Sequence, residues 1–175
     1  MKTPICSFDA KTGVLCAKCE EKLRSGQITQ DDVDASVKLT KAAGKSQEID
    51  RFTLTKGAQV EGEFVLALRG PDVLAIRSNP ALAEKVEKEF RQKVWFLDSE
   101  ASERGFIEGL FHPAKITTVN QFWMPDGSKV TRVIVAGRAP SAAAGGQQKK
   151  LDIEKVQKIA RAVRNMELLV EFEQK

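Results

Sequence analysis

The chain has 175 residues, of which 42% are hydrophobic, and this is enough to bury one compact core or two small ones. Its 28 lysines and arginines stand against 24 aspartates and glutamates, and a net charge of +4 is too small by itself to mark a nucleic-acid-binding protein. No apolar run has the length of a membrane span and the first residues lack the pattern of a signal peptide, so we expect a cytoplasmic protein with no membrane partner.

All three cysteines lie near the N-terminus, and an odd number of thiols in a cytoplasmic protein favours metal binding over disulfides. Cys16 and Cys19 form a Cys-x-x-Cys pair, and Cys6 and Asp9 have the same spacing with a carboxylate in place of the second thiol. A Lys-Thr-Gly turn between the pairs would bring the four residues to one tetrahedral zinc ion. We therefore predict that residues 1–27 form a small Cys-rich element with one structural zinc ion.

A metal-free alternative stays open for this element. In that alternative three reduced thiols lie in a short hairpin, which closes on its own apolar residues Ile5, Phe8, Val14 and Leu15. A redox-active Cys-x-x-Cys is less favoured because no βαβ pattern surrounds it. His112, the only histidine, ranks below Asp9 as a fourth ligand because it lies far along the chain.

Residues 28–45 have the pattern of a helix. Thr29 and Asp32 have the spacing of a capping box, which satisfies backbone N–H groups at a helix start. The expected buried stripe is modest and consists of Val33, Val37, Thr40 and Ala43. The other faces are polar, so this helix is predicted to pack without chemistry of its own.

Residues 52–55 and 63–68 alternate between apolar and polar side chains and predict a hairpin, with its turn at Gly57. A short helix follows over 71–76, and Asn79-Pro80 separates it from a second helix. Leu82, Val86 and Phe90 mark the apolar face of that helix, and residues 94–97 have the composition of a buried strand. The order α-β-β-α-α-β over 28–98 is that of the type II KH fold.

KH domains grip single-stranded RNA through a Gly-x-x-Gly loop between their two short helices. Here the corresponding residues are Arg77, Ser78, Asn79 and Pro80, so both glycines are missing. Arg69 and Arg77 could reach a phosphate from the rim, and Ser78 or Asn79 could cap the next helix. The pattern favours a mainly structural KH-like unit over a direct RNA grip.

Residues 99–175 predict a second unit of the same kind. Ser99 is expected to cap a helix that ends at His112-Pro113, and its apolar face consists of Phe106, Ile107, Leu110 and Phe111. Two strands follow at 114–123 and 129–136, around a Met-Pro-Asp-Gly turn. Trp123, Lys129 and Arg132 could serve base stacking and phosphate contact on an exposed face, although an aromatic residue at a hairpin end is more often packed.

A loop without apolar periodicity is expected over 137–150, followed by a core-facing helix and a closing strand. Residues 149–164 are the most basic stretch of the chain. Its predicted RNA-binding residues are Lys149, Lys150, Lys155, Lys158 and Arg161. An ordinary solvated helix face explains the same charges equally well.

Three runs and the closing helix and strand together resemble a known family. The runs are Leu-Ala-Ile at 74–76, Lys-Val-Trp-Phe at 93–96 and Phe-Ile-Glu-Gly-Leu-Phe-His-Pro-Ala-Lys at 106–115. Over 50–173 the chain is similar to the NusA-like transcription elongation or termination factors of archaea, which consist of two KH domains. The resemblance implies an α+β protein with two tandem type II KH-like units that binds single-stranded RNA during transcription.

A second hypothesis is a protein-interaction scaffold, in which degenerate KH units dock on RNA polymerase or the ribosome without gripping RNA. An enzyme with a small-molecule substrate is disfavoured, because the chain has one histidine and lacks nucleophile-elbow and phosphate-loop motifs.

Overall fold

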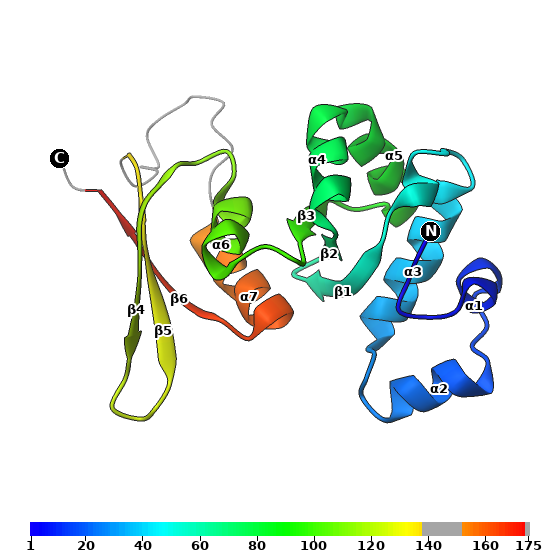
Figure 1. Ribbon diagram of the computed structural model, residues 1–175, viewed down its shortest axis with the longest axis horizontal. Coiled ribbons are helices and arrows are strands. Elements are labelled where there is room, and N and C mark those ends of the chain that lie inside the picture. Colours follow the sequence, from blue (N-terminus) through cyan, green and yellow to red (C-terminus); the bar gives the residue numbers. More distant parts are fainter. Residues whose placement is uncertain (138–151, 174–175) are drawn as a thin grey trace. The chain divides into compact units, whose positions relative to one another are not determined.

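The computed structural model describes residues 1–137 and 152–173. The chain divides into two compact units, Met1–Ala101 and Ser102–Lys175. Over the described residues the protein is α+β, with seven α-helices and two three-stranded sheets (Figure 1). The elements are α1 Ser7–Thr12, α2 Ala17–Arg24, α3 Gln30–Ala43, the 3₁₀ helix η1 Ile49–Arg51, β1 Leu54–Val60, β2 Glu63–Leu68, α4 Gly70–Ser78, α5 Pro80–Phe90, β3 Val94–Asp98, α6 Glu103–Phe111, β4 Ile116–Trp123, β5 Lys129–Val135, α7 Ile153–Arg164 and β6 Glu167–Phe172.

The Cys-rich N-terminal element is part of the first unit. Its helices α1 and α2 are short, and Gly13 adopts φ 76° at the end of α1, a left-handed conformation that lets the chain turn back. The N-terminal residues are tied to the sheet edge, because the Lys2 N–H donates to Phe52 O and Lys2 O accepts from Leu54 N–H. The element therefore has backbone as well as side-chain contacts with the rest of the unit.

The capping box that was predicted for α3 is confirmed. The Thr29 N–H donates to Asp32 Oδ2 at 2.8 Å, and the Asp32 N–H donates to Thr29 Oγ1 at 3.2 Å. Asp32 Oδ1 also accepts the Gly57 N–H at 2.7 Å, so the cap fixes the start of α3 to strand β1.

The buried face of α3 differs from the predicted stripe. Ala35, Leu39 and Ala42 are its most buried apolar side chains and belong to the main core of the unit, together with Ala43 of the predicted stripe. Val33 and Val37 instead pack on the N-terminal element. Helix α3 thus has two covered faces, which a single stripe could not reveal.

The first sheet has the order β1-β2-β3, with β1 antiparallel and β3 parallel to β2. The turn predicted at Gly57 is wrong, because Gly57 lies inside β1. A Cβ atom there would come within 2.5 Å of Ala35 Cβ, so glycine is required by the close approach of α3. The actual turn is Glu61-Gly62, where both residues have positive φ as in the two-residue hairpin turns that match strand twist.

Helices α4 and α5 follow the hairpin as predicted. Leu82, Val86 and Phe90 of α5 are buried, and the Phe90 ring meets the Phe64 ring of β2 edge to face at 5.0 Å. Strand β3 then returns parallel to β2, so the order in the first unit is α3-β1-β2-α4-α5-β3.

The second unit repeats the arrangement of strands, with β4 antiparallel and β6 parallel to the central β5. Helices α6 and α7 lie along one face of this sheet (Figure 1). The cap of α6 is Ser102 rather than the predicted Ser99, because the Ser102 Oγ accepts the Gly105 N–H. Ser99 instead bonds to the Thr55 hydroxyl. Most of the loop predicted over 137–150 lies outside the described residues.

Candidate metal centre

The four predicted metal ligands take equivalent places on two short helices. Cys6 is the N-cap of α1 and Asp9 lies three residues later, while Cys16 is the N-cap of α2 and Cys19 lies three residues later. Each pair is thus one helical turn apart at a helix start. The partial positive charge of a helix N-terminus favours thiolate and carboxylate groups at these positions.

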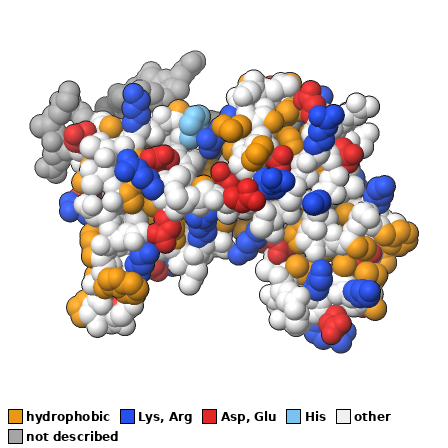
Figure 2. All heavy atoms as spheres, viewed as in Figure 1, with side chains coloured by type: hydrophobic (Ala, Val, Ile, Leu, Met, Phe, Trp, Pro, Cys, Tyr) orange, Lys and Arg blue, Asp and Glu red, His pale blue; other side chains and the backbone are white. Residues whose placement is uncertain are grey.

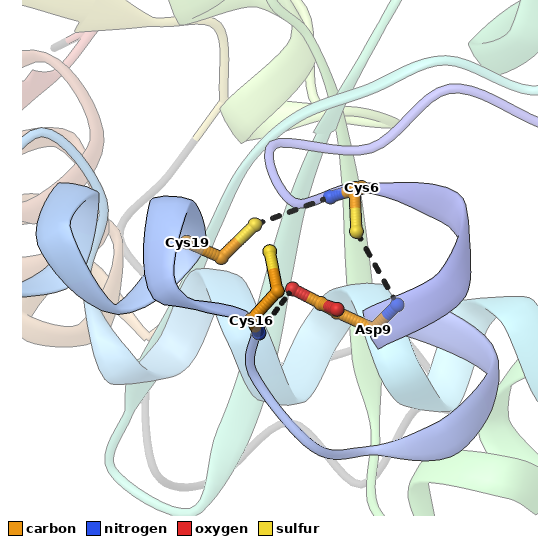
Figure 3. Close-up of side chains that lie close together, drawn as sticks. All are labelled: Cys6, Asp9, Cys16 and Cys19. Carbon is orange, nitrogen blue, oxygen red and sulfur yellow. Dashed lines mark hydrogen bonds between the residues drawn. The ribbon is translucent and has the colours of Figure 1, made fainter.

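The side chains of these four residues converge (Figure 3). Their ligand atoms, three Sγ atoms and one carboxylate oxygen, all lie within 4.8 Å of one another. In a tetrahedral zinc site with bonds of about 2.3 Å the ligand atoms are about 3.8 Å apart. The cluster would therefore have to contract by only about 1 Å to hold a metal ion.

Asp9 gives the most direct indication of a cation. Its side chain is completely buried, and its Oδ2 accepts the Cys16 N–H at 3.0 Å. Its Oδ1 is also buried and has no hydrogen-bond partner among the described residues. The Cys16 N–H and the Cys19 thiol hold the pKa of the Asp9 carboxyl well below its usual range, so the group is ionised. A buried carboxylate with a bare oxygen fits a site completed by a metal ion.

Cys19 is the least accessible thiol of the cluster. It is buried, and its Sγ accepts the Cys6 N–H at 3.5 Å. The Asp9 carboxylate beside it, together with burial, raises the pKa of Cys19 to about 12. The thiol is therefore protonated at neutral pH without metal, and a bound cation would have to displace this proton.

The packing predicted for the metal-free hairpin is confirmed for Ile5 and Leu15 and wrong for Phe8 and Val14. Ile5 is buried and Leu15 packs against the same cluster, whereas Phe8 and Val14 are 69% and 68% exposed. The core of the element is instead formed with α3, and it contains Ile5, Ala10, Cys19, Ile28 and Val33. His112 belongs to the second unit and is not one of the four clustered residues.

The residues proposed for RNA at the α4–α5 junction are all exposed. Arg69 precedes α4, and its Nε lies 3.6 Å from Glu100 Oε1. Arg77 and Ser78 form the end of α4, and the Asn79 side chain caps neither helix. Among the described residues, no ion pair is formed by Arg77.

The basic residues of the second unit are only partly described. Lys149 and Lys150 lie outside the described residues. Lys155, Lys158 and Arg161 lie on α7, and Arg161 forms an ion pair with Glu167 at 2.6 Å. The fold thus carries three of the five predicted cations on one helix.

The hairpin residues Trp123, Lys129 and Arg132 do not share one face. Trp123 pairs with Lys129 across the strands, so these two side chains lie on one face. Arg132 pairs with Asn120, which lies three residues before Trp123 on β4. Since side chains alternate along a strand, Arg132 lies on the opposite face, where it forms an ion pair with Glu171. The predicted shared face is therefore wrong for Arg132, although the odd spacing of Lys129 and Arg132 along one strand already indicates opposite faces.

No protein-family model matches the chain, and no curated protein matches it. Among solved structures it is similar to one described as "Crystal structure of APE1850", with a TM-score of 0.55 and 14% sequence identity. The match covers 78% of this chain and 95% of that one. At 14% identity the similarity to this structure concerns the fold alone.

Within the described part of the chain, no helix is both long and apolar enough to cross a membrane.

Proposed function

We propose that this protein is a non-enzymatic RNA-binding factor similar to NusA, built from two tandem KH-like units. The observation that carries the proposal is the order α3-β1-β2-α4-α5-β3 with a mixed sheet, which is the type II KH order. The same strand arrangement in the second unit supports a duplicated architecture. The RNA would be single-stranded, because KH folds read unpaired strands.

The α4–α5 junction supports a phosphate contact in the first unit. Helix α5 has no acidic residue in its first turn and no side-chain cap, so its positive end is not neutralised locally. Exposed Arg77 lies next to this end. Because the two glycines of a KH clamp are missing, the contact would come from the arginine and the helix dipole rather than from a backbone cradle.

Helix α7 supports a second contact, through Lys155, Lys158 and Arg161, with Lys149 and Lys150 as further candidates. The Arg161–Glu167 ion pair does not oppose this, because exposed ion pairs contribute under about 1 kcal/mol and exchange readily for a phosphate. Binding of this kind depends on salt, with a log–log slope of about −0.7 for each phosphate contact on a single strand.

The test is a titration of short single-stranded RNAs at two salt concentrations. The double variant Lys155→Glu with Lys158→Glu should weaken binding at least tenfold at low salt and reduce the salt slope. The control is the same charge reversal at Lys41, an exposed lysine at the end of α3. Equal affinity of the double variant and the wild-type protein would refute the assignment of α7.

The missing glycines favour a second candidate function, a scaffold that docks on RNA polymerase or the ribosome without gripping RNA. Wild-type protein that does not bind single-stranded RNA at low salt, yet binds RNA polymerase or the ribosome, would favour the scaffold.

We also propose that Cys6, Asp9, Cys16 and Cys19 hold one structural zinc ion. Four protein ligands would close the coordination shell, so the metal would stabilise the fold and leave no position for a substrate. Reduced thiols are needed for this, so the site requires a reducing compartment. Elemental analysis should find one zinc per chain, reduced in Asp9→Asn and unchanged in Glu20→Gln, a matched change of an exposed carboxylate on α2. Zinc-free wild-type protein, purified without chelators, would refute the centre.

A further inference from the structure

The end of the β4–β5 hairpin exposes a large aromatic side chain. Trp123 closes strand β4 and is 73% exposed, and the neighbouring Phe122 and Met124 are 36% and 45% exposed. Figure 2 shows hydrophobic side chains at this end of the hairpin, at the lower left of the view. Packing at the hairpin end, the alternative suggested by the sequence, therefore does not describe Trp123.

A cation lies directly opposite Trp123. Trp123 and Lys129 are cross-strand partners, and side chains at such positions start about 5 Å apart. The Lys129 Nζ is held 3.1 Å from Glu103 Oε1, and the Gln121 amide also donates to Glu103. This ion pair is partly exposed, with side-chain exposures of 35% for Lys129 and 47% for Glu103, so water screens it and a phosphate could compete for the ammonium group.

The two faces of the hairpin differ in what they offer a ligand. Trp123 and Lys129 share one face, whereas Phe122 lies on the other with Arg132, which is paired with Glu171. An exposed indole ring beside a partly exposed ammonium group has the composition of single-strand binding sites, in which a ring stacks on a base and a cation contacts the adjacent phosphate.

We propose that Trp123 stacks on an unpaired nucleobase of single-stranded RNA and that Lys129 contacts the neighbouring phosphate. This rests on the RNA-binding function proposed above and adds a contact that neither the α4–α5 junction nor the α7 cations supply. Stacking does not depend on base identity, so the contact adds affinity rather than sequence specificity.

The tryptophan itself supplies the readout. The chain has two tryptophans, and Trp95 is half-buried with its Nε1–H bonded to Glu63 Oε2 at 2.6 Å. Short oligouridylate should quench the fluorescence of Trp123 in wild-type protein. Trp123→Phe should remove this quenching, while RNA binding measured by anisotropy persists. Because one base stack contributes about 1–3 kcal/mol, Trp123→Ala should weaken binding measured by anisotropy by about 5- to 150-fold.

Phe122→Ala is the matched control, since it removes an exposed aromatic ring from the opposite face and should leave RNA affinity within about twofold. Lys129→Gln should reduce the salt slope by about 0.7, the value for one phosphate. RNA binding with no quenching and no loss in Trp123→Ala would overturn this site while leaving the proposed function intact. No RNA binding by wild-type protein would overturn both. If the end of the β4–β5 hairpin binds a protein partner instead, Trp123→Ala should bind RNA with wild-type affinity, and this result would also refute stacking by Trp123.

Discussion

Replacing Cys16 by serine should have opposite effects with and without zinc. Cys16 is the N-cap of α2 but forms no capping hydrogen bond through its side chain. Serine is among the best N-cap residues, so in metal-free protein Cys16→Ser should be neutral or stabilise the first unit by up to about 1 kcal/mol. With zinc the variant should be less stable, because it lacks one of three thiolate ligands.

The magnitude follows from linkage. At a free zinc concentration of 100 times the wild-type Kd, binding stabilises the folded state by about 2.7 kcal/mol. If loss of one ligand weakens zinc binding 100-fold, the same zinc concentration stabilises the folded state by only about 0.4 kcal/mol. The difference of about 2.3 kcal/mol corresponds to about 9 to 18 °C in the Tm of a unit the size of Met1–Ala101.

The assay is thermal unfolding followed by circular dichroism, in buffered zinc and in excess chelator, for wild type and Cys16→Ser. Ser7→Ala serves as the control, because it changes α1 and leaves all four ligands in place. A wild-type Tm that is the same in zinc and chelator would refute a stabilising metal. A Cys16→Ser Tm that rises with zinc as much as the wild-type Tm would show that the ligand set is wrong.

Three further substitutions and one control probe the fold. Gly57→Ala should lower the free energy of unfolding in denaturant by about 1–3 kcal/mol, because the new Cβ would lie 2.5 Å from the Ala35 Cβ of α3. The control Gly44→Ala should leave it unchanged, because Gly44 has helical φ and its nearest contact would be at 3.5 Å. Thr29→Ala should cost about 1 kcal/mol by removing the α3 cap, and an unchanged midpoint would contradict the capping role. Hydrogen bonds from Lys129 and Gln121 lower the pKa of Glu103 below its ordinary 4.5, so its stabilisation is present above that pH and lost below it. Glu103→Gln should therefore cost under about 1 kcal/mol at pH 7, and the difference should vanish in acid.

Local signals in the sequence predicted most of the secondary structure. The apolar spacing of Leu82, Val86 and Phe90 identified α5, and the Thr29 capping box marked the start of α3. The repeated i, i+3 spacing of Cys6 with Asp9 and of Cys16 with Cys19 identified the candidate metal ligands. Each of these signals is contained within one or two helical turns, so it can be recognised without knowing what surrounds it.

Two of the errors occurred where a residue's role depends on a distant segment. Gly57 indicated a turn when taken alone, but glycine is needed there because α3 passes close to β1. Val33 and Val37 belong to an apolar pattern, yet only the position of the N-terminal element shows that they pack on it rather than on the main core.

The sequence by itself determined the order of α-helices and strands from α3 to β6, the cap of α3 and the pairing of two ligand motifs. Only the tertiary structure decided that the four ligand atoms converge, that Asp9 is buried with a bare oxygen, and that Trp123 is exposed beside Lys129. The physical reason is one of range: hydrogen bonding and periodicity act over a few residues, whereas burial and convergence depend on which distant segments pack together.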